Sequence, residues 1–230
     1  MHELNKGYNQ WHGNHEHEDD HATPWHSFVR ANLSGNDVLN KMILEIGCGR
    51  GGFSNYLINH KDQPSMIHAC DYSETALKIG AEKYQSPKIV WSRQDIMSMT
   101  FESNSIDTAI SCETIEHVPN PSRAIQELYR VLKPGGRLYL TCPNYFNFFG
   151  VWCVYRWLIG KPYTEGGQPY VNYILMPKVY HWIRQAGFIV EKFHSSELIM
   201  PARIPKHFYK HNTPRLLRPF GYRTYYVVRK

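Results

Sequence analysis

The feature that most constrains the fold is a glycine-rich loop directly after a short apolar segment. Residues 42–46 read Met-Ile-Leu-Glu-Ile, and residues 47–52 read Gly-Cys-Gly-Arg-Gly-Gly. Gly47, Gly49 and Gly52 satisfy the G-x-G-x-x-G pattern, in which glycines allow a tight turn and a close approach of the backbone to a ligand. This pattern predicts a strand, a ligand-binding turn and a helix, which together open a doubly wound α/β sheet.

Short apolar segments alternate with helical patterns along most of the chain. The expected strands cover residues 42–46, 66–70, 88–91, 106–111, 137–142, 188–193 and 222–228. The expected helices cover residues 25–33, 53–59, 73–84, 121–132 and 177–186. This alternation indicates a parallel sheet with helices on both faces. The linkers around the last two strands lack a regular crossover-helix pattern, so we expect the last strand to be antiparallel.

The chain is expected to form one domain over residues 23–230, because 230 residues with 42% hydrophobic content suit a single α/β core. Residues 1–22 are rich in His, Asn and acids, and we expect a flexible segment there, either a solvated tail or a flap that orders over bound substrate. Two segments interrupt the alternation. They are an aromatic cap insertion at 143–176 and a basic, Pro-rich insertion at 197–221.

The net charge of +6 is unevenly distributed along the chain. Residues 1–26 carry five acids and one lysine, whereas residues 201–230 carry eight Lys or Arg and no acid. A basic segment can contact nucleic acid, anionic lipid or an acidic substrate. No RNA-recognition motif accompanies it, so nucleic acid is not an expected partner and a solvated surface is the favoured interpretation.

Three observations concern the cellular compartment. No run of about 18 apolar residues is present, so no transmembrane helix is expected, and the polar N-terminus is unlike a secretory signal. Five cysteines, with no Cys-x-x-Cys pair, argue against a disulfide scaffold or a zinc ribbon. We therefore expect a cytoplasmic protein.

Acidic residues follow the expected strands at positions suited to a nucleoside cofactor. Glu45 lies two residues before Gly47, where a carboxylate is unsuited to a pyrophosphate but suits a cationic amino group. Asp71 follows the second strand, where an acid can hold ribose hydroxyls. Asp95 follows the third strand and can accept from an adenine amino group, with Ile96 packing on the ring; the alternative is a helix N-cap.

With these motifs, the chain resembles class I S-adenosylmethionine (SAM)-dependent methyltransferases of the ubiquinone/menaquinone-biosynthesis type. The matching stretches are residues 43–52, 68–84, 106–121 and 127–143. The resemblance implies a Rossmann-like seven-stranded sheet with the last strand antiparallel, SAM as cofactor, and methyl transfer. The expected cofactor-binding residues are Glu45, Gly47, Cys48, Gly49, Gly51, Asp71, Tyr72, Asp95, Ile96 and Cys112.

The stretch after the fourth strand supplies the candidate catalytic residue. His117 is the expected general base, because a neutral imidazole can accept a proton near pH 7; the alternative is a histidine that only orients the loop. Glu113, Glu116 and His117 also form Glu-x-x-Glu-His, which resembles the metal-binding stretch of ubiquinone-pathway O-methyltransferases. Those enzymes add a second histidine downstream that is missing here, so no metal is expected.

The expected acceptor is a small aromatic or apolar molecule, with oxygen as the first choice of acceptor atom and nitrogen as the second. The aromatic segment favours a cap over such a molecule. Core packing is one alternative for it, and contact of residues 146–159 with a lipid surface is another. The rival functions are a nicotinamide dehydrogenase and a non-catalytic nucleic-acid-binding protein.

Overall fold

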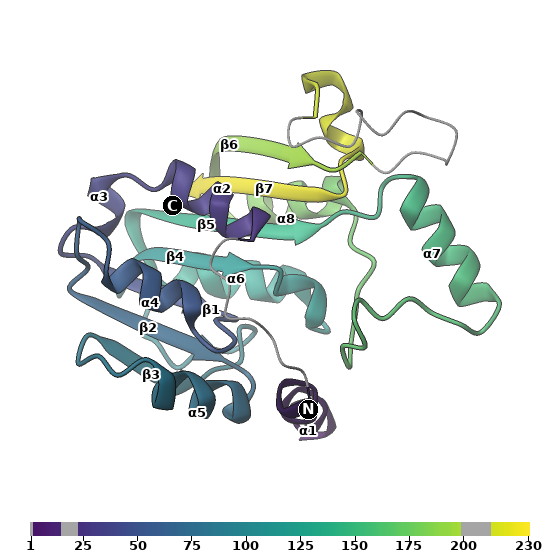
Figure 1. The fold of residues 1–230 in the computed structure, drawn as a ribbon. Helices are drawn as coiled ribbons and strands as arrows, with labels where there is room; N and C mark the ends of the chain where they lie inside the picture. Colours follow the sequence, from purple (N-terminus) through teal and green to yellow (C-terminus); the bar gives the residue numbers. More distant parts are fainter. Residues whose placement is uncertain (1, 15–22, 199–212) are drawn as a thin grey trace.

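A seven-stranded sheet with the order β3-β2-β1-β4-β5-β7-β6 forms the centre of the molecule (Figure 1). The computed structural model describes residues 2–14, 23–198 and 213–230. The strands are β1 (Met42–Ile46), β2 (Met66–Asp71), β3 (Ile89–Arg93), β4 (Ile106–Cys112), β5 (Leu132–Pro143), β6 (Ile189–Ser196) and β7 (Arg223–Arg229). The first five strands pair in parallel, and β7 runs antiparallel to both β5 and β6. This confirms the expected Rossmann-like sheet with an antiparallel last strand.

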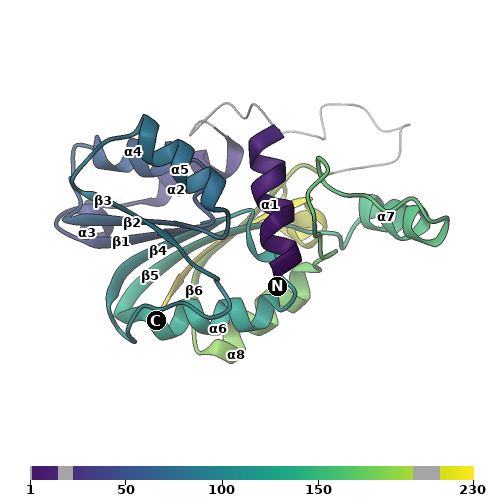
Figure 2. The same ribbon diagram turned by 90° about the horizontal axis from the view of Figure 1, so that it is seen from below.

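Helices cover both faces of the sheet, as Figure 2 shows. One face carries α2 (Pro24–Asn32), α3 (Gly35–Val38), α4 (Gly52–Ile58) and α5 (Glu74–Lys83). The other carries α6 (Pro121–Val131) and α8 (Met176–Ala186). Because strand side chains alternate between faces, Ile43 packs with the α2 and α4 side, whereas Leu44 packs with the α6 and α8 side. The strand order reverses between β1 and β4, where open α/β sheets bind ligands.

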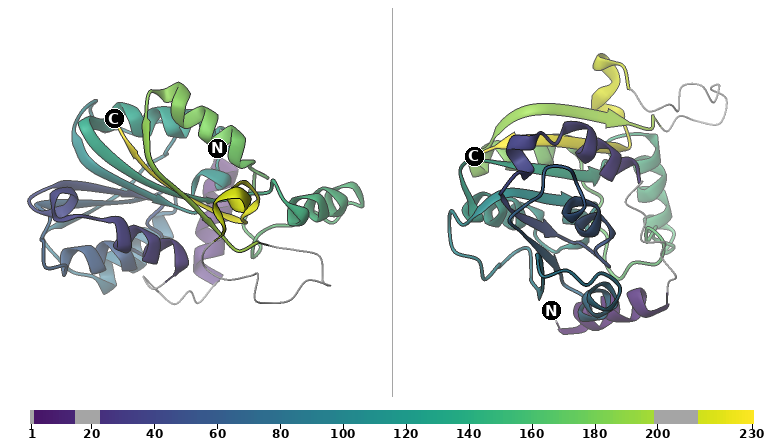
Figure 3. Two further views of the ribbon diagram at one scale, coloured as in Figure 1. Left: turned by 90° about the horizontal axis from the view of Figure 1, so that it is seen from above. Right: turned by 60° about the vertical axis from the view of Figure 1, so that its left-hand side comes forward.

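The first described segment is a helix, α1 (His2–Asn14), where the sequence predicted a flexible chain. It lies across the end of the sheet in Figures 2 and 3. The Asn5 amide donates to the Tyr72 carbonyl at 2.6 Å, and the Ser73 hydroxyl donates to Asn9 Oδ1 at 2.9 Å. Tertiary contacts of this kind stabilise α1, although its residues favour a helix only weakly. Residues 15–22 of the expected flexible segment lie outside the described residues.

The aromatic segment 143–176 contains one helix, α7 (Phe148–Leu158), which projects from the body of the molecule (Figure 1). Within this fully described segment, Gln168 alone lines the cavity described below, so α7 does not cover it. In the basic segment 197–221, residues 199–212 lie outside the described part, and η3 (Arg215–Phe220) is a short 3-10 helix. None of the described helices has the length and apolar character needed to cross a membrane.

Candidate functional site

One cavity of about 350 Å³ lies at the carboxyl ends of the central strands. Every site residue predicted from the sequence lines it. These residues are Glu45, Gly47, Cys48, Gly49, Gly51, Asp71, Tyr72, Asp95, Ile96, Cys112 and His117. They come from the carboxyl ends of β1, β2 and β4 and from the segments that follow β1, β2, β3 and β4, and parallel strands bring these positions to one edge of the sheet.

The glycine loop has a conformation that side chains would disturb. Gly47 and Gly51 have φ of 77° and 75°, in the left-handed region where glycine carries no Cβ penalty. A Cβ on Gly47 would overlap the Thr114 side chain, and one on Gly51 would overlap the Trp91 ring. The loop can therefore bring its backbone N–H groups close to a ligand while it packs against Thr114 and Trp91.

Two buried carboxylates flank this loop. Asp71 accepts from the Gly49 N–H and the Ser73 N–H, both at 2.8 Å, so it also fixes the position of the loop. Glu45 is 4% exposed and accepts from the Ser54 hydroxyl. Burial raises the pKa of Glu45 to about 7, and the nearby charge of Asp71 adds to the shift. An acidic, apolar-walled cavity of this kind favours a cationic ligand.

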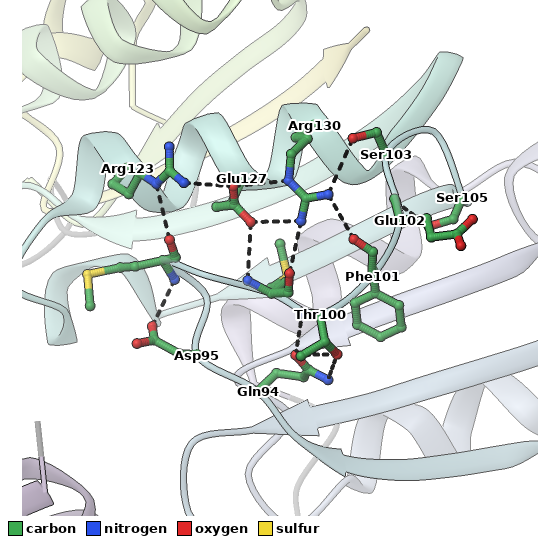
Figure 4. Close-up of polar contacts among 12 residues, drawn as sticks. Gln94, Asp95, Thr100, Phe101, Glu102, Ser103, Ser105, Arg123, Glu127 and Arg130 are labelled. Atoms are coloured by element: carbon green, nitrogen blue, oxygen red, sulfur yellow. Dashed lines mark hydrogen bonds and ion pairs between the residues drawn. The ribbon is translucent and has the colours of Figure 1, made fainter.

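Asp95 lies in a tight turn and not at a helix N-terminus, so the helix-cap interpretation is wrong. Asp95 Oδ1 accepts from the Met97 N–H at 2.8 Å, and Ile96 is buried beside the cavity. Figure 4 shows how α6 supports this turn: Arg123 Nε donates to the Met97 carbonyl, and Glu127 accepts from the Met99 N–H at 3.1 Å. The turn is thus held independently of any ligand.

His117 ends a 3-10 turn, η1 (Ile115–His117), that follows β4. Its Nδ1 lies 2.8 Å from the Tyr170 carbonyl oxygen. Because a carbonyl can only accept, Nδ1 carries the proton and Nε2 keeps its lone pair. Burial lowers the pKa of His117, so the ring is neutral at pH 7.

A cluster of acids lies beside His117. Glu113 pairs with Arg223 at 2.8 Å and accepts from the Thr141 hydroxyl at 2.8 Å. Glu116 is fully buried, neither of its oxygens has a hydrogen-bond partner among the described residues, and burial raises its pKa well above the usual value. Its Oε1 lies 3.6 Å from His117 Nε2. Glu165 completes the group, since atoms of Glu116, His117 and Glu165 all lie within 4.8 Å of one another.

Helix α1 contributes a wall of the cavity, and none of its residues was among the predicted site residues, although a flap over bound substrate was one expectation for this segment. Leu4, Tyr8, Trp11 and His12 all line the cavity. The Tyr8 hydroxyl donates to the His117 carbonyl at 3.0 Å, which ties α1 to the catalytic candidate. The signal was present, because Leu4, Tyr8 and Trp11 recur at the i, i+4, i+7 spacing of one helix face. Glu165 was missed because its partners lie far away in sequence.

Comparison with known proteins finds similarity over the central part of the chain. Residues 44–140 match the protein family described as a methyltransferase domain. The chain is similar to phthiotriol/phenolphthiotriol dimycocerosates methyltransferase of Mycobacterium leprae, at 32% identity over 54% of this chain and 44% of that protein. It is also similar to ubiquinone biosynthesis O-methyltransferase of Coxiella burnetii, at 28% identity over 64% of this chain and 63% of that protein. The chain therefore spans 44 to 63% of the length of these relatives.

Solved structures agree on the fold. A SAM-dependent methyltransferase from Mesorhizobium loti aligns with a TM-score of 0.66 at 18% identity, over 91% of this chain and 99% of that one. The predicted fold is thus confirmed. Residues 44–140 thus match a methyltransferase domain, and the chain is similar in sequence and fold to methyltransferases that include one of ubiquinone biosynthesis.

Proposed function

We propose that the chain transfers the methyl group of SAM to an oxygen atom of a small, aromatic or apolar acceptor. The observation that carries this proposal is the presence of a neutral His117 imidazole in the same cavity as the glycine loop and its two carboxylates. Bound in this cavity, SAM supplies a methyl group already activated by its sulfonium. The protein then has to position the acceptor and remove its proton.

Each part of the cavity suits one part of the cofactor. Glu45 would hold the cationic amino group, and Asp71 would accept from the ribose hydroxyls. Asp95 would accept from the adenine amino group, while Ile96 packs on the ring. Cys48, Tyr72 and Cys112 would form the remaining contacts, and the glycine loop would approach the methionine end.

His117 would take the proton of an acceptor hydroxyl through Nε2. The hydrogen bond from Nδ1 to the Tyr170 carbonyl fixes the tautomer that this role needs. Oxygen is favoured as the acceptor atom, because a phenol or enol must lose its proton whereas a neutral amine need not do so before attack. The Coxiella burnetii relative is an O-methyltransferase, which supports the same choice.

Two measurements test the proposal. Equilibrium dialysis should show retention of labelled SAM and no retention of NAD. With methyl-labelled SAM, label should pass to phenolic or catecholic acceptors in preference to matched aromatic amines. Retention of NAD would favour a dehydrogenase, and transfer to amines alone would overturn the choice of oxygen.

A second candidate keeps the same reaction but adds a divalent ion, and the grouping of Glu116, His117 and Glu165 is the observation that favours it. We expect thorough chelation to leave kcat unchanged within about twofold. The physical reason is that His117 lines the cavity but Glu116 and Glu165 do not, so an ion held by all three could not also reach the acceptor. In addition, Glu113, the first acid of the Glu-x-x-Glu-His motif, forms a salt bridge with Arg223.

The control for chelation is the Glu165→Gln variant, which should behave like the parent protein with and without added metal. Loss of activity on chelation, restored by magnesium or manganese in the parent but not in Glu165→Gln, would replace the metal-free reaction with a metal-assisted one.

A further inference from the structure

Helix α7 exposes apolar side chains to an extent that is unusual for a protein surface. Val151, Trp157 and Leu158 are 68%, 63% and 69% exposed. Val154 and Tyr155 are also more than half exposed, and Leu216 of η3 is 90% exposed. We call these six residues the α7 patch. Contiguous apolar surface of this kind marks a contact with another molecule or with a membrane.

The domain fixes the orientation of α7, so the helix cannot turn this surface inward. Its inner side is held by Gly150 and Cys153, the two buried residues of the helix. Where a Cβ would lie on Gly150, the Tyr145 carbonyl already occupies the space. Phe146, just before α7, stacks on Phe220 of η3 with ring centroids 5.6 Å apart. This stacking holds the start of α7 beside the end of η3.

The charged residues within α7 and η3, and those that directly follow α7 in the sequence, are basic. No Asp or Glu occurs between residues 128 and 164, or after residue 197. Arg156 lies in the last turn of α7, Lys161 follows the helix, and Arg215 is exposed at the start of η3. An apolar helix with Trp and Tyr, bordered by basic residues and no acids, has the character of segments that lie at the interface of an anionic bilayer.

A second copy of the chain fits this surface less well. A two-fold contact would bring the same basic residues of both copies together without an acid to pair them. The position also suits a lipid surface. Because α7 follows the carboxyl end of β5, which is parallel to β4, it lies at the same edge of the sheet as the cavity (Figure 1).

We propose that the α7 patch binds an anionic lipid surface, with the exposed side of α7 buried at the boundary between headgroups and acyl chains. The bilayer would then lie beside the edge of the sheet that holds the cavity. This proposal concerns binding to a surface, and it stands or fails independently of the methyl acceptor.

Vesicle flotation with the full chain tests the proposal. The protein should float with vesicles of phosphatidylcholine mixed with phosphatidylglycerol, and much less with phosphatidylcholine alone, and added salt should weaken the binding. Leu158→Glu should lower the partition coefficient about tenfold or more, because an apolar anchor is lost. Ile189→Glu is the matched control. Ile189 is 51% exposed, but it begins β6 at the opposite edge of the sheet, so this variant should bind like the parent protein.

Three outcomes would overturn the proposal: no flotation of the parent protein with anionic vesicles, equal flotation of Leu158→Glu, or a stable dimer that Leu158→Glu dissociates, which would assign the patch to a second copy. Dialysis against labelled SAM separates this result from the proposed function. Leu158 lies outside the cavity, so Leu158→Glu should retain SAM even when it no longer binds vesicles.

Discussion

Replacing His117 with alanine should lower kcat for an oxygen acceptor by about 10²–10⁴-fold, the usual range for loss of a general base. The reason is geometric, because the Tyr170 carbonyl holds Nδ1 and leaves the Nε2 lone pair to take the proton. Affinity for SAM should change little, since the glycine loop, Glu45 and Asp71 hold the cofactor in the proposed arrangement. The initial rate of label transfer from labelled SAM gives kcat, and calorimetry gives the SAM affinity.

The pH profile separates a catalytic role of His117 from a structural one. The base must be neutral, so kcat should fall as pH drops through the His117 pKa, which burial places below the ordinary value. His117→Ala should lack this acidic limb. His181 lies on the exposed side of α8, so His181→Ala is the matched control. This variant should keep the parental kcat and its decrease at acidic pH. A His117→Ala enzyme with parental kcat and an unchanged profile would leave catalysis to positioning alone.

The part of the cavity around the glycine loop could be predicted from the sequence because its signals are local. Each predicted acid, Glu45, Asp71 and Asp95, follows or ends a short apolar strand, and parallel pairing brings such positions to one edge. The glycines are required by the loop itself, where a Cβ on Gly47 would overlap Thr114. Strand positions, the pairing pattern and the place of the glycine loop therefore follow from short-range patterns.

The rest of the cavity, around His117 and α1, depends on contacts between distant segments. Helix α1 has Gly7 and Gly13 and many polar residues, so its composition predicts a flexible chain, and contacts such as that of Asn5 with the Tyr72 carbonyl stabilise the helix. The aromatic content of residues 143–176 indicated a cap, but composition does not give the direction in which α7 projects. The grouping of Glu165 with Glu116 likewise arises only when the chain folds.

Glu45→Gln should weaken SAM binding by about 2–5 kcal/mol, the cost of removing one partner of a buried charge pair. Glu45 is 4% exposed and lies at the end of β1, so the amino group of the ligand would face an amide in place of a carboxylate. Glu82→Gln, on the exposed surface of α5, is the matched control and should bind SAM like the parent protein.

The affinity of the parent protein for SAM should also depend on pH through Glu45. Burial raises the pKa of this carboxyl to about 7 in the free protein, and a bound ammonium favours its ionised form, so binding releases a proton below that pH. Affinity should therefore be constant above about pH 7 and fall as pH decreases, by at most about tenfold per unit, while Glu45→Gln should show no such slope. Calorimetry with S-adenosylhomocysteine and with an analogue that lacks the amino group gives the sharpest test. If Glu45 contacts the amino group, Glu45→Gln should lower the affinity for S-adenosylhomocysteine more than the affinity for the analogue. Equal losses of affinity for both ligands in Glu45→Gln would mean that Glu45 supports the loop through Ser54 and does not contact the amino group.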